Sequence, residues 1–163
     1  MSLLRSMFEY KAWANEGLYQ GLMAQCGKIA KEDEHAAMLI LHHNYVVDDI
    51  FAANLQGQAH GILTTAPELT PPLEELFSAV RSIDRWYIDY VTDLDVAALR
   101  EMMDFTFTDG KPGRMSREEM LGHVLGHGAY HRGEVGQLLT RLTGSSPRDT
   151  FTGYLHEIRP VHA

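Results

Sequence analysis

Residues 116–144 read SREEMLGHVLGHGAYHRGEVGQLLTRLTG, and this stretch decides the fold class. Ser116, followed three residues later by Glu119, forms a capping box, which is typical of a helix start. Gly144 stands where a glycine ends a helix. Apolar residues recur between these limits at the three-and-four spacing of an amphipathic helix, at Met120, Val124, Val135, Leu138 and Leu142.

Three other segments show the same spacing of apolar residues. They are residues 3–26, 31–55 and 73–91. We expect Gly27 to end the first helix and Thr70 to cap the third, with proline following it. Four amphipathic helices of this length predict an all-α fold, a four-helix bundle.

A longer connection separates the third and fourth helices. Residues 105–108 alternate apolar and polar side chains and meet Asp109-Gly110, a pattern typical of a hairpin turn. A crossover that carries this hairpin would permit a non-sequential helix order. Residues 148–163 show no clear pattern, and we assign no element there.

Length and composition bound the class of protein. The 163 residues fit a single domain over residues 1–163, since domains usually have roughly 100–200 residues. The net charge of −8 disfavours a nucleic-acid partner, because phosphate binding needs Lys and Arg. The first residues lack the apolar stretch typical of a signal peptide, so we expect none, and no apolar run approaches the length of a membrane span. With one cysteine and no possible internal disulfide, we expect a soluble, cytoplasmic protein without membrane association.

Two histidines of the fourth helix carry the strongest chemical signal. His127 and His131 are four residues apart, about 6 Å along the helix axis, and both fall inside the apolar stripe. They are either core histidines bonded to their neighbours or ligands of a metal ion. His123 lies one turn earlier, too far along the axis to share one ion with His131.

A third ligand would have to come from another helix. In residues 31–55, His43 shares its face with apolar residues, whereas His42 shares its face with His35, Asp49 and Gln56. We therefore expect His43 to point inward and His42 to meet solvent. Three inward imidazoles need polar partners, and one shared divalent ion would satisfy all three. Three protein ligands are typical of an open, catalytic zinc site.

The same stretches resemble a known family. HNYVVDDIF at residues 43–51, HGAYHRGE at residues 127–134 and YKAWAN at residues 10–15 are similar to signatures of the DinB/YfiT-like family. Glu134 stands where glutamine is usual in that family. The resemblance covers essentially the whole chain. It implies an up-down-down-up bundle, commonly a homodimer, with zinc or nickel on three histidines: His43, His127 and His131. Relatives include thiol-dependent S-transferases and a mycothiol-dependent maleylpyruvate isomerase.

Other polar and aromatic residues near these motifs allow more than one role. Asp48 would orient a liganding imidazole, meet solvent or pair with Arg132. Tyr130 and Glu134 flank the histidines and are weak candidates for catalytic acid or base. Trp13 lies away from the apolar stripe of its helix, so it packs in the core or forms a dimer contact. Cys26 ends a helix without a histidine neighbour, and we do not expect it to be a nucleophile.

These features favour a metal-dependent enzyme that acts on a small molecule. A bound metal ion lowers the pKa of water or of a thiol, so the reaction is either hydrolysis or a thiol-dependent S-transfer or isomerisation with a low-molecular-weight thiol cofactor. A carboxylate-bearing thiol would need an arginine such as Arg132 or Arg81. The alternatives are a metal-stabilised binding bundle without turnover, closed by Glu134 or His123 as a fourth ligand, and a histidine seam without metal.

Overall fold

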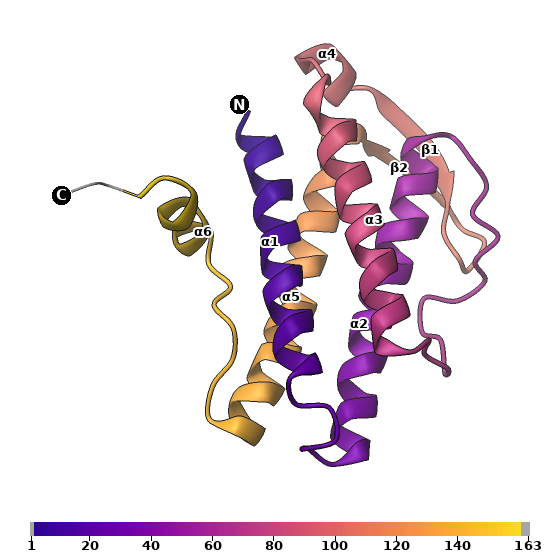
Figure 1. Cartoon of the computed structure of the whole chain (residues 1–163). Helices are drawn as coiled ribbons and strands as arrows, with labels where there is room; N and C mark the ends of the chain where they lie inside the picture. Colours follow the sequence, from indigo (N-terminus) through magenta and orange to yellow (C-terminus); the bar gives the residue numbers. More distant parts are fainter. Residues whose placement is uncertain (1, 161–163) are drawn as a thin grey trace.

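A computed structural model describes residues 2–160, and this part of the chain is mostly helical with one small sheet. Met1 and residues 161–163, which the expected domain also includes, lie outside the described residues. The elements in chain order are α1 (Leu3–Met23), α2 (Lys31–Leu55), α3 (Leu73–Thr92), α4 (Val96–Leu99), β1 (Met102–Thr106), β2 (Pro112–Ser116), α5 (Arg117–Thr143) and α6 (Phe151–Ile158) (Figure 1). The mostly helical class predicted from the sequence is confirmed.

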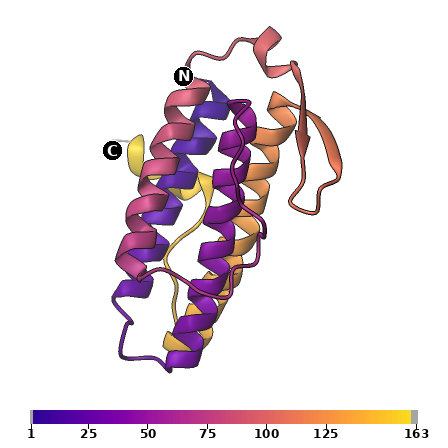
Figure 2. The ribbon, with the colours of Figure 1, turned by 90° about the vertical axis from the view of Figure 1, so that its right-hand side faces the viewer.

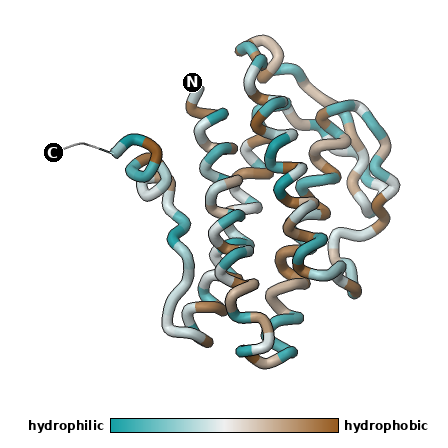
Figure 3. Tube along the Cα trace, viewed as in Figure 1, coloured by the Kyte–Doolittle hydropathy of each residue, from teal (hydrophilic) through white to brown (hydrophobic). Residues whose placement is uncertain are grey.

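The four long helices lie alongside one another and bury the core between them (Figure 2). Both α1 and α2 pack against α3 and α5. Apolar and polar residues alternate along each of these helices, which is the amphipathic pattern that buries one face (Figure 3). Stacked ring pairs, Phe8 on Tyr87 and Tyr19 on Phe77, join α1 to α3. Burying a side chain of this size stabilises the fold by about 1.5–3 kcal/mol.

The ends of the helices follow the local sequence at some sites and not at others. The capping box of Ser116 and Glu119 opens α5, and Gly144 ends it in the left-handed conformation, with φ 84°. In contrast, α1 already ends at Met23, and Gly27 belongs to the turn that follows. Thr70 does not cap α3, whose N-cap is Pro72. A residue before proline is biased away from helical geometry, so the helix begins only after the second of two consecutive prolines.

The predicted hairpin forms between α4 and α5. Strands β1 and β2 are antiparallel, with Phe105 opposite Gly113. Gly110 occupies the turn with φ 83°, a conformation that favours glycine, and its N–H donates to the carbonyl of Phe107. Strand β1 begins at Met102, earlier than the alternating stretch suggested.

Helix α6 forms in the segment to which the sequence assigned no element. Its Tyr154 packs against Tyr10 and Trp13 of α1, and the Trp13 indole N–H donates to Glu157. This contact explains why Trp13 lies off the main stripe of α1, because α6 of the same chain covers it. Within residues 2–160, no helix combines the length and the apolar character that crossing a bilayer requires.

Candidate metal centre

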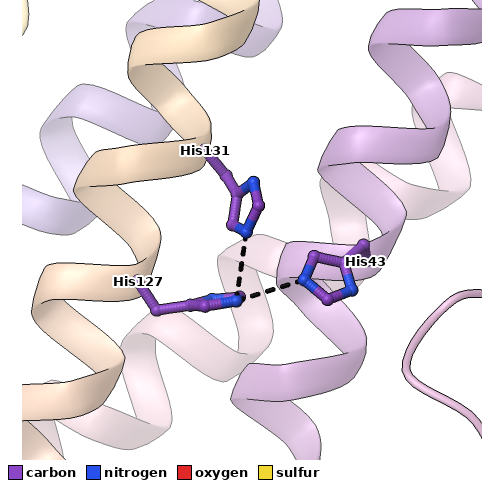
Figure 4. Close-up of side chains that lie close together, drawn as sticks. All are labelled: His43, His127 and His131. Atoms are coloured by element: carbon purple, nitrogen blue, oxygen red, sulfur yellow. Dashed lines mark hydrogen bonds between the residues drawn. The ribbon is translucent and has the colours of Figure 1, made fainter.

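Three histidine side chains meet between α2 and α5 (Figure 4). The Nε2 atom of His127 lies 3.1 Å from Nε2 of His43 and 3.1 Å from Nε2 of His131. One nitrogen from each of the three rings lies within 4.8 Å of the other two. Two tetrahedral ligands at about 2.05 Å from a zinc ion would be about 3.3 Å apart, so this spacing fits one ion.

Helix geometry explains the convergence. His127 and His131 lie one turn apart on α5, which places both rings on the face that packs against α2. His43 projects from α2 toward both of them, with its ring centroid 5.0 Å and 4.7 Å from theirs. The apolar residues around it on α2, including Val46 and Val47, are buried.

Each imidazole is held through its other nitrogen. The Nδ1–H of His43 donates to the carbonyl of Thr65 at 2.5 Å, that of His127 to the Asn44 Oδ1 at 3.2 Å, and that of His131 to the Glu134 carboxylate at 2.6 Å. Metal-ligating histidines commonly have such a partner, which fixes the tautomer and the ring orientation.

This arrangement leaves three acceptors facing one another. Because the Nδ1 atoms carry the protons, all three Nε2 atoms present lone pairs, and none can donate to its neighbours. Lone pairs at 3.1 Å repel unless a cation lies between them. The donor set therefore fits a divalent metal ion. Burial, reinforced by the neighbouring His131 and His43, lowers the pKa of His127 to about 3, which keeps its imidazole in the neutral form that binds metal.

The other predicted candidates lie outside this group. His42 bonds the carbonyl of Leu69 through Nδ1 and takes no part in the cluster. His123 stacks on Phe51 with ring centroids 4.6 Å apart, and burial lowers its pKa. Glu134 meets His131 at Nδ1, on the opposite side of the ring from Nε2. Among the described residues, the group that could hold one ion consists of the three histidines alone.

A cleft of about 370 Å³ adjoins the histidines, and two of them line it. It lies between α2, α5 and the β1–β2 hairpin. Its lining consists of His43, Val47, Ile50, Phe51, Asn54, Thr65, Phe105, Thr106, Phe107, Thr108, Met115, His123 and His127. Tyr130, a weak catalytic candidate, lies outside this lining; it is 66% exposed and its ring meets His131 edge-on.

Comparison with known proteins assigns the family. The family model described as "DinB family" matches residues 1–159 of the chain. The chain belongs to the DinB family. Searches of curated proteins and of solved structures found no significant match. The resemblance carried by the three sequence signatures is thus confirmed, and the histidine cluster of this DinB-family chain lies in two of those signatures.

Asp48 of this DinB-family chain has a different role from those expected. It is buried, with an exposed fraction of 1%, and pairs with Lys11 at 2.8 Å; Lys11 also pairs with Asp84 of α3. It neither bonds a liganding histidine nor pairs with Arg132, whose partner is Asp149. Burial raises the pKa of Asp48 to about 6, although the Lys11 ammonium opposes the shift. The ion pairs of Lys11 with Asp48 and Asp84 therefore join α1, α2 and α3, and they do not support the imidazoles.

Sequence reasoning missed the residues that orient two of the ligands. Asn44 directly follows His43, and its amide polarity on a buried face was an available signal. Thr65 acts through its backbone carbonyl, for which no residue type gives a signal. Desolvation and the nearby Glu34 raise the pKa of the exposed Cys26 thiol to about 11, which disfavours the reactive thiolate.

Proposed function

We propose that this protein is a metal-dependent enzyme that binds one divalent transition-metal ion, zinc or nickel, through His43, His127 and His131. One observation carries the proposal: three Nε2 atoms converge while each Nδ1 is already bonded. Structural zinc usually has four protein ligands, whereas catalytic zinc has three and an open position. The bond between Glu134 and Nδ1 of His131 therefore favours an enzyme over a metal-stabilised bundle without turnover.

A divalent ion with three neutral imidazole ligands would supply a Lewis acid that lowers the pKa of a water or thiol nucleophile beside the cleft. The leading reaction class is thiol-dependent S-transfer or isomerisation, in line with the DinB family resemblance, and hydrolysis is the alternative. Glu134 acts as a positioning residue, because it holds the His131 ring by a charge-assisted hydrogen bond. Tyr130 is the remaining candidate for proton transfer, since its exposed ring packs against His131.

We also propose an up-down-down-up four-helix bundle that assembles as a homodimer. In Figure 1 the chain descends α1, ascends α2 and α3 and descends α5, which supports this helix order. Large apolar side chains exposed on the single chain support an association of two copies; they include Leu63, Leu69, Phe107 and Tyr130. Trp13 no longer supports it, because α6 of the same chain covers this residue.

Metal content tests the proposed centre. Purified protein should contain close to one transition-metal ion per chain, and His43→Ala, His127→Ala and His131→Ala should each lose it. The matched control is His42→Ala, which removes the neighbouring imidazole outside the cluster and should retain the metal. Equal loss in the control, or metal-free wild-type protein after growth with added zinc and nickel, would contradict the proposal.

Cobalt substitution separates the thiol from the hydrolytic reaction. A thiol that enters the open position binds as thiolate, because coordination stabilises the anion. Thiolate ligation should add a charge-transfer band to the spectrum of the cobalt protein, and the His131→Ala variant should not give it. The absence of a band with cobalt verified in the protein would exclude S-transfer and leave hydrolysis.

A further inference from the structure

The cleft beside the three histidines has an uncharged lining. None of the thirteen described residues that line it is Lys, Arg, Asp or Glu. Three aromatic rings stand in its walls: Phe51 from α2, and Phe105 and Phe107 from the hairpin. His123 adds a fourth flat ring, stacked on Phe51 with ring centroids 4.6 Å apart. Such a surface favours apolar and aromatic groups.

A second hollow of about 490 Å³ lies next to the cleft, between the hairpin and the segment after α2. Asn54, Phe105 and Phe107 line both spaces, so they form a shared wall. The only charged residue in the described lining of the second hollow is Asp104, an acid. Neither described lining therefore offers a lysine or an arginine to an anionic ligand.

The arginines that could serve a carboxylate are engaged elsewhere. Arg132 is buried and bonded to Asp149 of the segment before α6. Arg81 of α3 is paired with Glu16 of α1. Neither lines the cleft or the second hollow. A ligand carboxylate buried in these spaces would lose its hydration without gaining a partner, which is costly.

Gly113 sets the position of two rings in the wall. A methyl group at this residue would lie 2.5–2.8 Å from ring atoms of Phe105 and Phe107, closer than real contacts allow. Glycine therefore permits both rings to rest on the backbone of β2. An alanine at this position would displace the rings and change the cleft without touching the histidines.

We propose that the cleft binds an uncharged, apolar and preferably aromatic small molecule, and that Phe51, Phe105 and Phe107 determine this specificity. The identification of this molecule as the substrate rests on the proposed function; its binding to the cleft does not. If the substrate carries an anionic group, only the metal ion could bind that group. The part of the substrate that lies in the cleft is uncharged. Thiols rich in carboxylates are thus disfavoured as partners of this chain.

Two fluorescent probes with the same ring skeleton test this specificity in the metal-free protein. N-phenylnaphthylamine is uncharged, and anilinonaphthalenesulfonate carries an anionic sulfonate. We expect the uncharged probe to bind more than about tenfold more tightly in a fluorescence titration, because burying an unpaired charge costs more than that ratio represents. Preparing the protein without metal prevents the ion from attracting the sulfonate.

Substitutions locate the binding and control for general effects. Asn54→Arg should reverse the preference, because the guanidinium gives the sulfonate a partner. Asn54→Met is the control: it also lengthens the side chain but adds no charge, so it should not reverse the preference. Gly113→Ala should weaken binding of the uncharged probe at least about threefold, since it displaces the ring wall. Gly122→Ala is the matched control, because a methyl group there meets open space.

The outcomes of these titrations are separable from those of the metal test. Equal or tighter binding of the sulfonate by the wild-type protein would overturn the inference. So would binding of the uncharged probe that neither Asn54→Arg nor Gly113→Ala alters. A failure of the metal measurements would overturn the proposed function and leave the specificity of the cleft intact.

Discussion

Single residues decide how firmly each imidazole is held, and Glu134 is the clearest case. Replacing it by leucine removes the acceptor from Nδ1 of His131 and should weaken metal affinity by about 10–100-fold, the usual effect of losing such a partner. Glutamine still presents an acceptor oxygen, so Glu134→Gln should retain most of the affinity. Competition with a chelator measures both. Unchanged affinity in the leucine variant, matched against the exposed control Glu118→Leu, would show that Glu134 does not position His131.

Asp48 gives a pH dependence with a defined sign. Its pKa is about 6 in the fold and near 3.8 when unfolded, so its ionised form is disfavoured in the folded protein. Its contribution to the free energy of unfolding should therefore rise as pH falls from about 6 to about 4, by at most about 3 kcal/mol. Burial lowers the pKa of Lys11, but the carboxylates of Asp48 and Asp84 outweigh burial and raise it overall, so the ammonium stays protonated throughout this range.

Urea unfolding of the wild type and of Asp48→Asn at pH 7 and pH 4.5 measures this contribution. The difference in stability between the two proteins should shift in favour of the wild type at the lower pH. Comparing the proteins at each pH cancels the titration of the histidines, which both contain. A difference that stays constant with pH, or shifts the other way, would contradict the raised pKa of Asp48.

At the scale of elements, the capping box positions the start of the helix that carries two histidines. Ser116→Ala removes the acceptor for the N–H of Glu119 and should cost about 1 kcal/mol in the free energy of unfolding. Ser145→Ala is the control, since Ser145 is exposed beyond the end of α5. Metal affinity should not change, because the box lies about 16 Å along the axis from His127. Equal stability of the two variants would show that the box contributes little.

The elements that the sequence predicted are those whose signals are local. The capping box, the glycine after α5 and the helical spacing of His127, His131 and His43 act over a few residues, and all were recognised. The position of helix α6, in contrast, depends on packing against Tyr10 and Trp13 of α1, which are distant in the sequence. The same holds for Lys11, whose partners come from two other helices, and for Thr65, which acts through its carbonyl. Contacts of this kind depend on the assembled fold.

For the whole molecule, we expect two copies to associate. Light scattering at micromolar concentration should give about twice the 18.4 kDa mass of one chain. Trp13→Phe should leave the association unchanged, because Trp13 is covered by α6 of its own chain. A mass of one chain would exclude the homodimer. Dissociation caused by Trp13→Phe would instead restore Trp13 as part of the interface.

The hydrogen bond between His43 and the carbonyl of Thr65 has a consequence for the energetics of metal binding. Thr65 belongs to residues 56–72, which form neither helix nor strand, so the centre is joined to a segment with much conformational entropy to lose. A metal ion that fixes the His43 ring would also restrict this segment, and part of the free energy of binding would offset the entropy lost there. Linkage makes the relation reciprocal. A molecule that binds against residues 56–72 and orders them would raise the affinity for the ion, and the ion would raise the affinity for that molecule by the same factor.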